Sequence, residues 1–464
     1  MKKGLIPLLL GLVMIAVLLG VAIPKTVQYF GKASGTSANL VVNYEGVIGM
    51  MPQVWRNLAQ GGEESKAMLG PVLAEVKALK PEYIRLDHIY DAFGVVSKVD
   101  GRLTYDWSGL DVAVDEILAT GAKPFLSLSY MPTAIASSDI VSLPNDWGEW
   151  GQVVQATVEH FSGKSNRNID QVIYEVWNEP DLFGDFKTYG EKNYLTMYEV
   201  SARAAIRAEN TNHFEIGGPA MTALYKNWLE KLIKFASEKK LPLDFLSWHR
   251  YDQNIEVFEQ DAKQADEWSE NIPAFLDLKF YVTEWGIDSQ NNLAYDDKLS
   301  AIHALAVTRV MMGRVDRAFV FEIKDGPGQE KYWGRWGLMT HEKFGKPEMK
   351  PRYQALVFLN HLLPFRVSLA GEGSWVKGIA SMNEAGNLKV LVVNYDSSGK
   401  HVESVPISFE NLPKGDFIYK RQDFMGESRS TKVATTSATF QTIEYMDPNT
   451  AMMLEIEFVV KIIK

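Results

Sequence analysis

The sequence predicts an α/β fold: a (β/α)8 TIM barrel with a C-terminal antiparallel β-sandwich and an N-terminal hydrophobic anchor. Eight short apolar runs alternate with helix-period segments, the pattern changes to alternating β-type runs after about Pro364, and an apolar stretch opens the chain. Short apolar strands without alternation are typical of a parallel sheet buried on both faces. Eight strand–helix units are the number that closes such a sheet into a barrel.

Residues 1–25 form the first predicted element. Two lysines precede an apolar run, and Leu5 to Ile23 is just long enough to span a bilayer. Because the lysines favour the cytoplasmic side, the sequence predicts a single anchor in a bacterial inner membrane and a periplasmic body. Secretion after signal cleavage near Gly20-Val21-Ala22 is the alternative. Residues 26–38 are small and mostly polar, which predicts a linker.

Residues 39–363 are predicted to form the barrel. The expected strands are Leu40–Tyr44, Tyr83–Asp87, Pro124–Tyr130, Val172–Trp177, Phe214–Gly218, Phe245–His249, Phe280–Glu284 and Arg317–Glu322. The expected helices are Glu64–Leu79, Gly109–Thr120, Trp147–Phe161, Tyr194–Glu209, Thr222–Glu238, Glu256–Ser269, Asp296–Met312 and Pro351–Leu363. This alternation of strand and helix is the signature of βαβ units.

Residues 364–464 are predicted to form the β-sandwich, because alternating or β-branched runs are separated there by Gly- and Asn-rich turns. The expected strands are Leu388–Tyr395, His401–Phe409, Phe417–Gln422, Thr431–Phe440 and Met452–Lys461.

Composition excludes several classes of function. The net charge is −10 and no block of Lys or Arg follows the N-terminus, which argues against a nucleic-acid partner. The absence of cysteine excludes disulfides, thiolate nucleophiles and Cys-based metal sites. The eight histidines form no His-x-His or His-Glu-x-x-His pattern, so no metal and no cofactor are predicted. The oligomeric state is left open.

Two strand-like runs each deliver a carboxylate beside an aromatic residue at their C-terminal ends. Glu179 lies in Trp-Asn-Glu-Pro, and Glu284 lies in Thr-Glu-Trp-Gly. In a barrel of this type the C-terminal ends of the strands surround the active site. Two carboxylates that face each other there are what cleavage of a glycosidic bond requires, one as proton donor and one to attack the sugar carbon.

A carboxylate at the end of an apolar strand needs partners to stay ionised. Arg85 on the second predicted strand and His249 on the sixth are the natural candidates for Glu284. Residues two apart on a strand share a side, so Tyr251 should accompany His249. By the same rule Glu175 should point inward with Glu179 and pair with Arg85 beneath the site.

These motifs, with His249-x-Tyr251 between them, resemble the clan of retaining glycoside hydrolases with (β/α)8 barrels, and glycoside hydrolase family 39 in particular. That family pairs a barrel with a β-sandwich and includes β-xylosidases, α-L-iduronidases and hydrolases of biofilm exopolysaccharide. The resemblance implies that Glu179 is the acid/base and Glu284 the nucleophile, with carboxyl groups about 5–5.5 Å apart. It also implies that Asn178 binds the 2-hydroxyl.

The resemblance further implies that Arg85 and Tyr251 hold Glu284 while His249 completes the floor of the site. One departure concerns the eighth strand, which ends in Phe321-Glu322-Ile323-Lys324-Asp325 instead of a Trp-containing run. Glu322 and Lys324 near the barrel mouth could contact substrate, but a paired surface charge is the favoured interpretation. The residues considered as aromatic contacts for substrate are Tyr130, Trp285, Phe321, Trp333 and Trp336.

The predicted function is therefore retaining hydrolysis of a β-linked polysaccharide or oligosaccharide, with an exported exopolysaccharide as the expected substrate. The alternative is a catalytically inactive carbohydrate-binding or assembly protein of an exopolysaccharide system. The presence of both Glu179 and Glu284, with Asn178 and Arg85 in place, argues against that alternative, because binding alone needs no proton donor paired with a nucleophile.

Overall fold

A computed structural model describes residues 35–62, 64, 66–269 and 278–459. Eight strands form a closed barrel in the order β10-β11-β2-β3-β6-β7-β8-β9, with every neighbouring pair parallel. They are β2 (Asn57–Gln60), β3 (Tyr83–Leu86), β6 (Lys123–Leu128), β7 (Val172–Val176), β8 (Phe214–Met221), β9 (Phe245–Tyr251), β10 (Lys279–Gly286) and β11 (Arg317–Phe321). The predicted barrel is confirmed.

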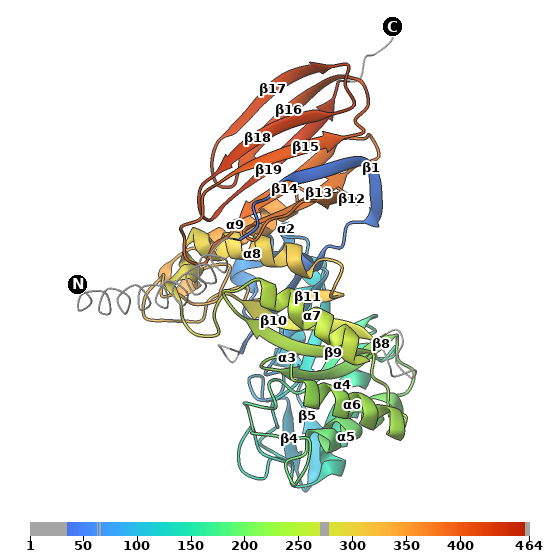
Figure 1. Cartoon of the computed structure of the whole chain (residues 1–464). Helices are drawn as coiled ribbons and strands as arrows, with labels where there is room; N and C mark the ends of the chain where they lie inside the picture. The colour runs from blue at the N-terminus through green and yellow to red at the C-terminus, as the bar shows by residue number, and fades with distance from the viewer. Residues whose placement is uncertain (1–34, 63, 65, 270–277, 460–464) are drawn as a thin grey trace, which may run out of the picture.

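Helices cover the outside of the barrel (Figure 1). They are α2 (Leu73–Ala78), α3 (Ser108–Thr120), α4 (Trp147–Ser162), α5 (Tyr194–Arg207), α6 (Lys226–Lys239), α7 (Glu256–Ser269), α8 (Lys298–Met311) and α9 (Pro351–Leu359). Local sequence sets their starts: Asp146, Asn193 and Asp297 each accept a backbone N–H at the first turn, the usual N-cap arrangement. α2 is shorter than predicted, because Pro71 lies in the preceding 3₁₀ turn Gly70–Val72.

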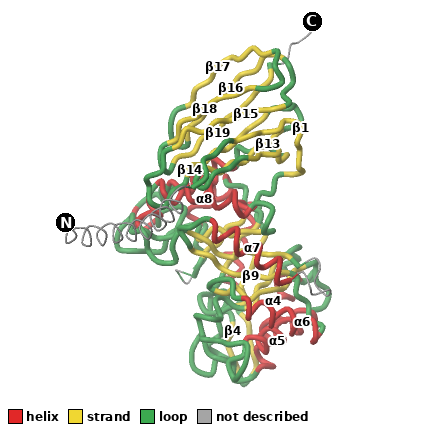
Figure 2. The backbone as a smooth tube through the Cα atoms, in the orientation of Figure 1, coloured by secondary structure: helices red, strands yellow, loops and turns green. Residues whose placement is uncertain are grey.

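A nine-stranded sheet packs beside α8 and α9, in the order β17-β16-β19-β14-β13-β12-β1-β15-β18 (Figure 2). Its strands are β1 (Leu40–Met50), β12 (Phe365–Ala370), β13 (Val376–Met382), β14 (Leu388–Asn394), β15 (Glu403–Glu410), β16 (Gly415–Asp423), β17 (Ser428–Thr435), β18 (Phe440–Met446) and β19 (Thr450–Phe458). All pairs are antiparallel except β1 with β15. The predicted antiparallel C-terminal structure is confirmed.

The sheet folds over on itself, so that strands near its two ends share one core. Phe417 and Tyr419 on β16 contact the ring of Phe440 on β18, and the Tyr419 hydroxyl donates to Glu444 at 2.8 Å. The sheet is also tied to the barrel, because Arg309 on α8 donates to the carbonyl of Gly378 at 2.9 Å.

Two predictions about elements are wrong. Leu40–Tyr44 is not the first barrel strand: it belongs to β1, between β12 and β15 of the large sheet. The first barrel strand is β2, whose Asn-Leu-Ala-Gln sequence has no β-branched residue to signal a strand. The single strand expected over Thr431–Phe440 is two strands, because the chain turns between β17 and β18.

The predicted inner-membrane localisation is corrected. Within residues 35–459, as far as they are described, no helix is long and apolar enough to cross a membrane. The predicted anchor, residues 1–25, and most of the predicted linker lie outside the described residues.

Candidate active site

The predicted acids meet at the C-terminal mouth of the barrel, where the described residues enclose a pocket of about 730 Å³. This volume lies in the range of roughly 300–1,000 Å³ that is typical of small-molecule sites. Residues from β3, β7, β9 and β10 or just after them reach it, among them Asn178, Glu179, Tyr251 and Glu284. The same strand ends carry the neighbours that control the two carboxylates.

A β-bulge aims Glu284 into the pocket. Along β10 the register with β9 shifts between Val282 and Glu284, so that Thr283 is an extra residue opposite the partner strand. Tyr281 packs inside the barrel, and strict alternation would turn Glu284 outward. The bulge reverses the alternation and points Glu284 inward, a use of bulges that is common beside active sites.

Glu284 accepts hydrogen bonds from one buried and one partly buried donor. Arg85 Nη1 donates to Oε1 at 2.9 Å and the Tyr251 hydroxyl donates to Oε2 at 2.8 Å. The guanidinium of Arg85 is itself locked, because Nε donates to Glu175 at 2.8 Å and Nη2 to Asn178 Oδ1 at 2.7 Å. The pairing of Arg85 with Glu175 expected from strand alternation is therefore present.

Glu179 lies at a distorted strand end. It adopts φ of 46° and Trp177 adopts 71°, and such left-handed non-glycine residues cost about 1–3 kcal/mol each. Hydrogen bonds hold this backbone: Glu179 N–H donates to the carbonyl of Ala220 at 3.0 Å, and Ser127 Oγ donates to that of Trp177 at 2.9 Å. The distortion turns the Glu179 carboxylate toward the centre of the pocket.

His249 joins the two acids. Its Nδ1 lies 2.8 Å from Glu179 Oε1 and 3.5 Å from Glu284 Oε2. One oxygen of each carboxylate and one nitrogen of His249 all lie within 4.8 Å of one another. Retaining glycosidases have carboxyl groups about 5–5.5 Å apart, whereas inverting enzymes need about 6.5–9.5 Å to admit a water. The close approach of one oxygen from each carboxylate favours the retaining spacing over the wider inverting one.

We expect the acid limb of the pH profile to lie above the pKa of an ordinary glutamate. Burial raises the pKa of Glu284, while His249 and Arg85 act in the opposite direction. The sequence resemblance implies that Glu284 is the nucleophile, which must be ionised, so kcat/KM should fall with decreasing pH sooner than for a solvent-exposed carboxylate. In His249→Asn, the loss of the positive charge of His249 should raise the pKa of Glu284 further and so move the acid limb to still higher pH. The measurement is kcat/KM against pH for both proteins, and an unshifted limb contradicts the assignment.

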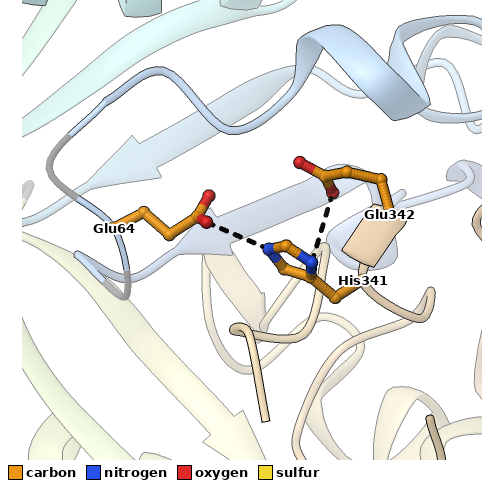
Figure 3. Close-up of side chains that lie close together, drawn as sticks. All are labelled: Glu64, His341 and Glu342. Carbon is orange, nitrogen blue, oxygen red and sulfur yellow. Dashed lines mark hydrogen bonds and ion pairs between the residues drawn. The ribbon is translucent and has the colours of Figure 1, made fainter. Parts of the chain in front are cut away.

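A second cluster, formed by Glu64, His341 and Glu342, lies among residues that do not line the pocket (Figure 3). His341 Nε2 lies 3.1 Å from Glu64 and its Nδ1 3.8 Å from Glu342, close enough to hold an ion. However, the Lys324 ammonium lies 2.6 Å from Glu342, and His341 Nδ1 accepts the N–H of Lys343 at 2.9 Å. These contacts neutralise Glu342 and use one imidazole nitrogen, so the cluster joins two loops and does not fit a metal.

A family model for glycosyl hydrolases family 39 matches residues 60–389. The chain belongs to this family. It is 26% identical over 409 residues to a beta-xylosidase of Caldicellulosiruptor saccharolyticus, covering 80% of this chain and 81% of that protein. It is a retaining glycoside hydrolase.

Solved structures share the fold of this family 39 hydrolase. A monomeric beta-xylosidase from Caulobacter crescentus CB15 matches 91% of this chain and 100% of that one, with a TM-score of 0.75 and 20% identity. The GH39 enzyme from Xanthomonas axonopodis pv. citri matches 92% and 99%, with a TM-score of 0.74 and 20% identity.

Of the predicted aromatic contacts, Tyr130, Phe321 and Trp336 line the pocket of this hydrolase. Tyr130 is almost fully buried and its hydroxyl accepts a hydrogen bond from Asn178 Nδ2 at 2.8 Å. It therefore orients Asn178 and offers little ring surface for stacking. Phe321 packs against Trp336 with ring centroids 5.2 Å apart, and these two rings form an aromatic wall.

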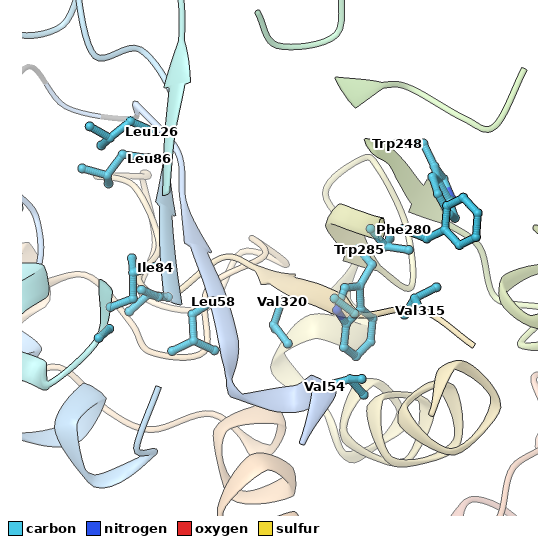
Figure 4. Close-up of a cluster of buried hydrophobic side chains, with 14 of the residues drawn as sticks. Val54, Leu58, Ile84, Leu86, Leu126, Trp248, Phe280, Trp285, Val315 and Val320 are labelled. Atoms are coloured by element: carbon cyan, nitrogen blue, oxygen red, sulfur yellow. The ribbon is translucent and has the colours of Figure 1, made fainter. Parts of the chain in front are cut away.

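Trp285 and Trp333 do not line the pocket. Trp285 is fully buried in the layer between barrel and helices, with Trp248, Phe280 and Val320 (Figure 4). The bulge that turns Glu284 inward necessarily turns the next residue outward. Trp333 is half-buried, and the guanidinium of Arg335 lies 5.3 Å from its ring.

Glu322 and Lys324 are fully buried, so their interpretation as a surface pair is wrong. Glu322 accepts a hydrogen bond from Gln60 Nε2 at 3.1 Å, and burial raises its pKa well above the ordinary value. Lys324 instead pairs with Glu342. Both side chains support the loop after β11 from below and neither lines the pocket.

Arg352 holds the aromatic wall against the strand that carries Glu284. Its buried guanidinium donates to the carbonyls of Phe321 at 2.7 Å, Trp336 at 3.1 Å and Trp285 at 2.9 Å. Lys350 secures the same loop by donating to the carbonyl of Arg335 at 3.0 Å. The start of α9 thus positions two sides of the pocket at once.

Sequence reasoning missed several pocket residues: Asp87, His88, Asp181, Phe183, Tyr225 and Arg335. For Asp87 and His88 a signal existed, because they directly follow Arg85-Leu86 at a strand end. Arg335 lies in a long loop after β11, and its guanidinium lies 3.5 Å above the ring of Trp336. Trp333 and Trp336 of this loop were expected at the barrel mouth, but no local pattern in the sequence singles out Arg335 as a pocket residue.

Proposed function

We propose that this chain hydrolyses β-linked glycosides by double displacement, with Glu179 as acid/base and Glu284 as nucleophile. One observation carries the proposal: both carboxylates reach one pocket, with an oxygen of each and a nitrogen of His249 within 4.8 Å of one another. Such a pair places a proton donor and an attacking oxygen about a single anomeric carbon.

In the first step Glu284 attacks the anomeric carbon while Glu179 gives its proton to the glycosidic oxygen, which leaves as an alcohol. The bond from carbon to the leaving oxygen breaks as the ester bond to Glu284 forms. Arg85 and Tyr251, which donate to the Glu284 oxygens, keep the carboxylate oriented for attack. Asn178, held by Tyr130 and Arg85, is proposed to bind the 2-hydroxyl.

In the second step Glu179, now a carboxylate, removes a proton from water. The resulting oxygen attacks the anomeric carbon and releases Glu284. His249, which lies 2.8 Å from Glu179, supports this carboxylate through a charge-assisted hydrogen bond when protonated. Two inversions return the sugar to its original β configuration.

The proposed substrate is a β-linked oligosaccharide or polysaccharide, and β-xylosides are the first compounds to test, because a beta-xylosidase is among the relatives. The aromatic wall of Phe321 and Trp336 favours a sugar in this pocket, since such faces stack on apolar sugar surfaces. A β-linked exopolysaccharide extends the proposal and rests on the sequence resemblance.

The decisive test follows the anomer released from aryl β-glycosides by proton NMR. We expect the β anomer of the free sugar to appear first and to mutarotate afterwards, because double displacement retains configuration. A panel of β-xylosides, β-glucosides, xylo-oligosaccharides and secreted β-linked polysaccharides then identifies the sugar. First appearance of the α anomer would exclude Glu284 as nucleophile and overturn the proposal.

A further inference from the structure

A third carboxylate lies in the pocket without a role in the chemistry described above. Asp87 follows β3, two positions beyond Arg85, and lines the pocket while only 7% of the residue is exposed. Its Oδ1 atom has no hydrogen-bond partner among the described residues. A buried carboxylate oxygen without a donor is destabilising, so this atom points to a donor supplied by a ligand.

The cations beside Asp87 are already engaged. Arg85 donates to Glu175 and Glu284. Burial lowers the pKa of His88, but Asp87 and Asp91 more than offset this and raise it to about 9. The His88 ring is nonetheless bonded to Asp91, with Nδ1 2.7 Å from Oδ2. Neither cation therefore donates a hydrogen bond to Oδ1 of Asp87.

The strand order divides the pocket into two sides. Phe183 and Tyr225, which follow β7 and β8, lie on the side of Glu179, the proposed donor of a proton to the leaving oxygen. Phe321 belongs to β11, directly across the barrel from β7, and Asp87 follows β3, which lies two strands from each of them. The leaving group must extend toward Glu179 and Asn178 is assigned to the 2-hydroxyl, so the hydroxyls left for Asp87 on the flank of the reacting sugar are those at C3 and C4.

We propose that Asp87 determines the specificity for the reacting sugar by accepting a hydrogen bond from a ring hydroxyl at C3 or C4. This assignment rests on the proposed function, because Glu179 and Glu284 mark the position of the anomeric carbon. A carboxylate is a strong acceptor for a hydroxyl. A site with a buried acceptor rejects analogues that lack the donor far more strongly than an apolar site rejects a missing methylene.

The test is a double-mutant cycle in which removal of the Asp87 carboxylate is combined with removal of one hydroxyl of the substrate. Full-length wild type, Asp87→Asn and Asp87→Ala are assayed on the best aryl β-glycoside and on its analogues deoxygenated at C3 and at C4. We expect Asp87→Ala to lower kcat/KM on the parent by about 100-fold, and on one deoxy analogue by less than about threefold. Asp87→Asn should fall between, because its amide oxygen still accepts.

Folding is followed by calorimetry, with Asp266→Ala and Asp266→Asn on exposed α7 as matched controls. A Tm for Asp87→Asn close to that of the wild type shows that any loss of activity does not come from a loss of folding. An equal loss on all three substrates, or no loss on any, overturns the role of Asp87 while hydrolysis by the wild type keeps the proposed function intact. A wild type inactive on every glycoside overturns both.

Discussion

Glu284→Gln is expected to lower kcat/KM on aryl β-glycosides by about 10⁴-fold or more, because the amide can neither attack the anomeric carbon nor carry the developing ester. The fold should survive the change. Burial disfavours the charge on Glu284, and Arg85 keeps its bonds to Glu175 and Asn178. The measurement is steady-state kinetics with a thermal unfolding scan of the same preparation.

Chemical rescue makes this prediction specific to a nucleophile. In Glu284→Ala, added azide should attack from the vacated side and give the α-glycosyl azide, with inversion. Glu384→Gln, in an exposed turn of the large sheet, is the matched control and should retain full activity. A Glu284→Gln protein that folds and hydrolyses at the wild-type rate would remove this residue from its role.

Glu179→Ala should show a loss of activity that depends on the leaving group. For alkyl glycosides and oligosaccharides, whose leaving oxygen must be protonated, we expect kcat/KM to fall by about 10³–10⁴-fold. For a dinitrophenyl glycoside, whose leaving group needs no proton, kcat/KM should fall by less than about tenfold. Kinetics on a series of leaving groups of decreasing acidity provides the measurement.

The second step supplies an independent check on Glu179. Without a general base the glycosyl ester on Glu284 should accumulate, so that kcat and KM both fall on the activated substrate and a burst of dinitrophenol appears. Azide should then restore turnover and give the β-glycosyl azide, since attack on the ester inverts the centre a second time. A loss that is equal for all leaving groups would instead indicate a structural role.

Much of the barrel could be predicted because its signals are local. Seven of the expected strands, Tyr83–Asp87 to Arg317–Glu322, overlap barrel strands, since parallel strands buried on both faces are apolar runs bounded by turns. The error at the first strand arose because the partners of that strand are distant in the sequence, so that no local signal identifies them. Leu40–Tyr44 is a good β sequence, but its partners β12 and β15 are more than 300 residues away, and β propensity does not specify a partner.

Some residues of the pocket could likewise be predicted from local sequence, and others could not. Glu179 and Glu284 are recognisable from their short motifs, and Arg85, His249 and Tyr251 follow from strand ends and alternation. Trp285 was misassigned because it directly follows Glu284, and neighbouring residues on a strand point to opposite sides. Arg335 and Trp336 enter the pocket from a loop that Arg352 holds in place, which depends on contacts between distant elements.

The sequence by itself determined the residue types at each strand end, and with them the proposed chemistry of a proton donor and a carboxylate nucleophile. Only the tertiary structure decided where those side chains point. Barrel closure brings the ends of β7 and β10 together, and the extra residue at Thr283 turns Glu284 inward. The tertiary structure also leaves Asp87 buried, with its Oδ1 atom lacking a hydrogen-bond partner among the described residues. These outcomes depend on register and packing between segments far apart in the chain, which no local pattern encodes.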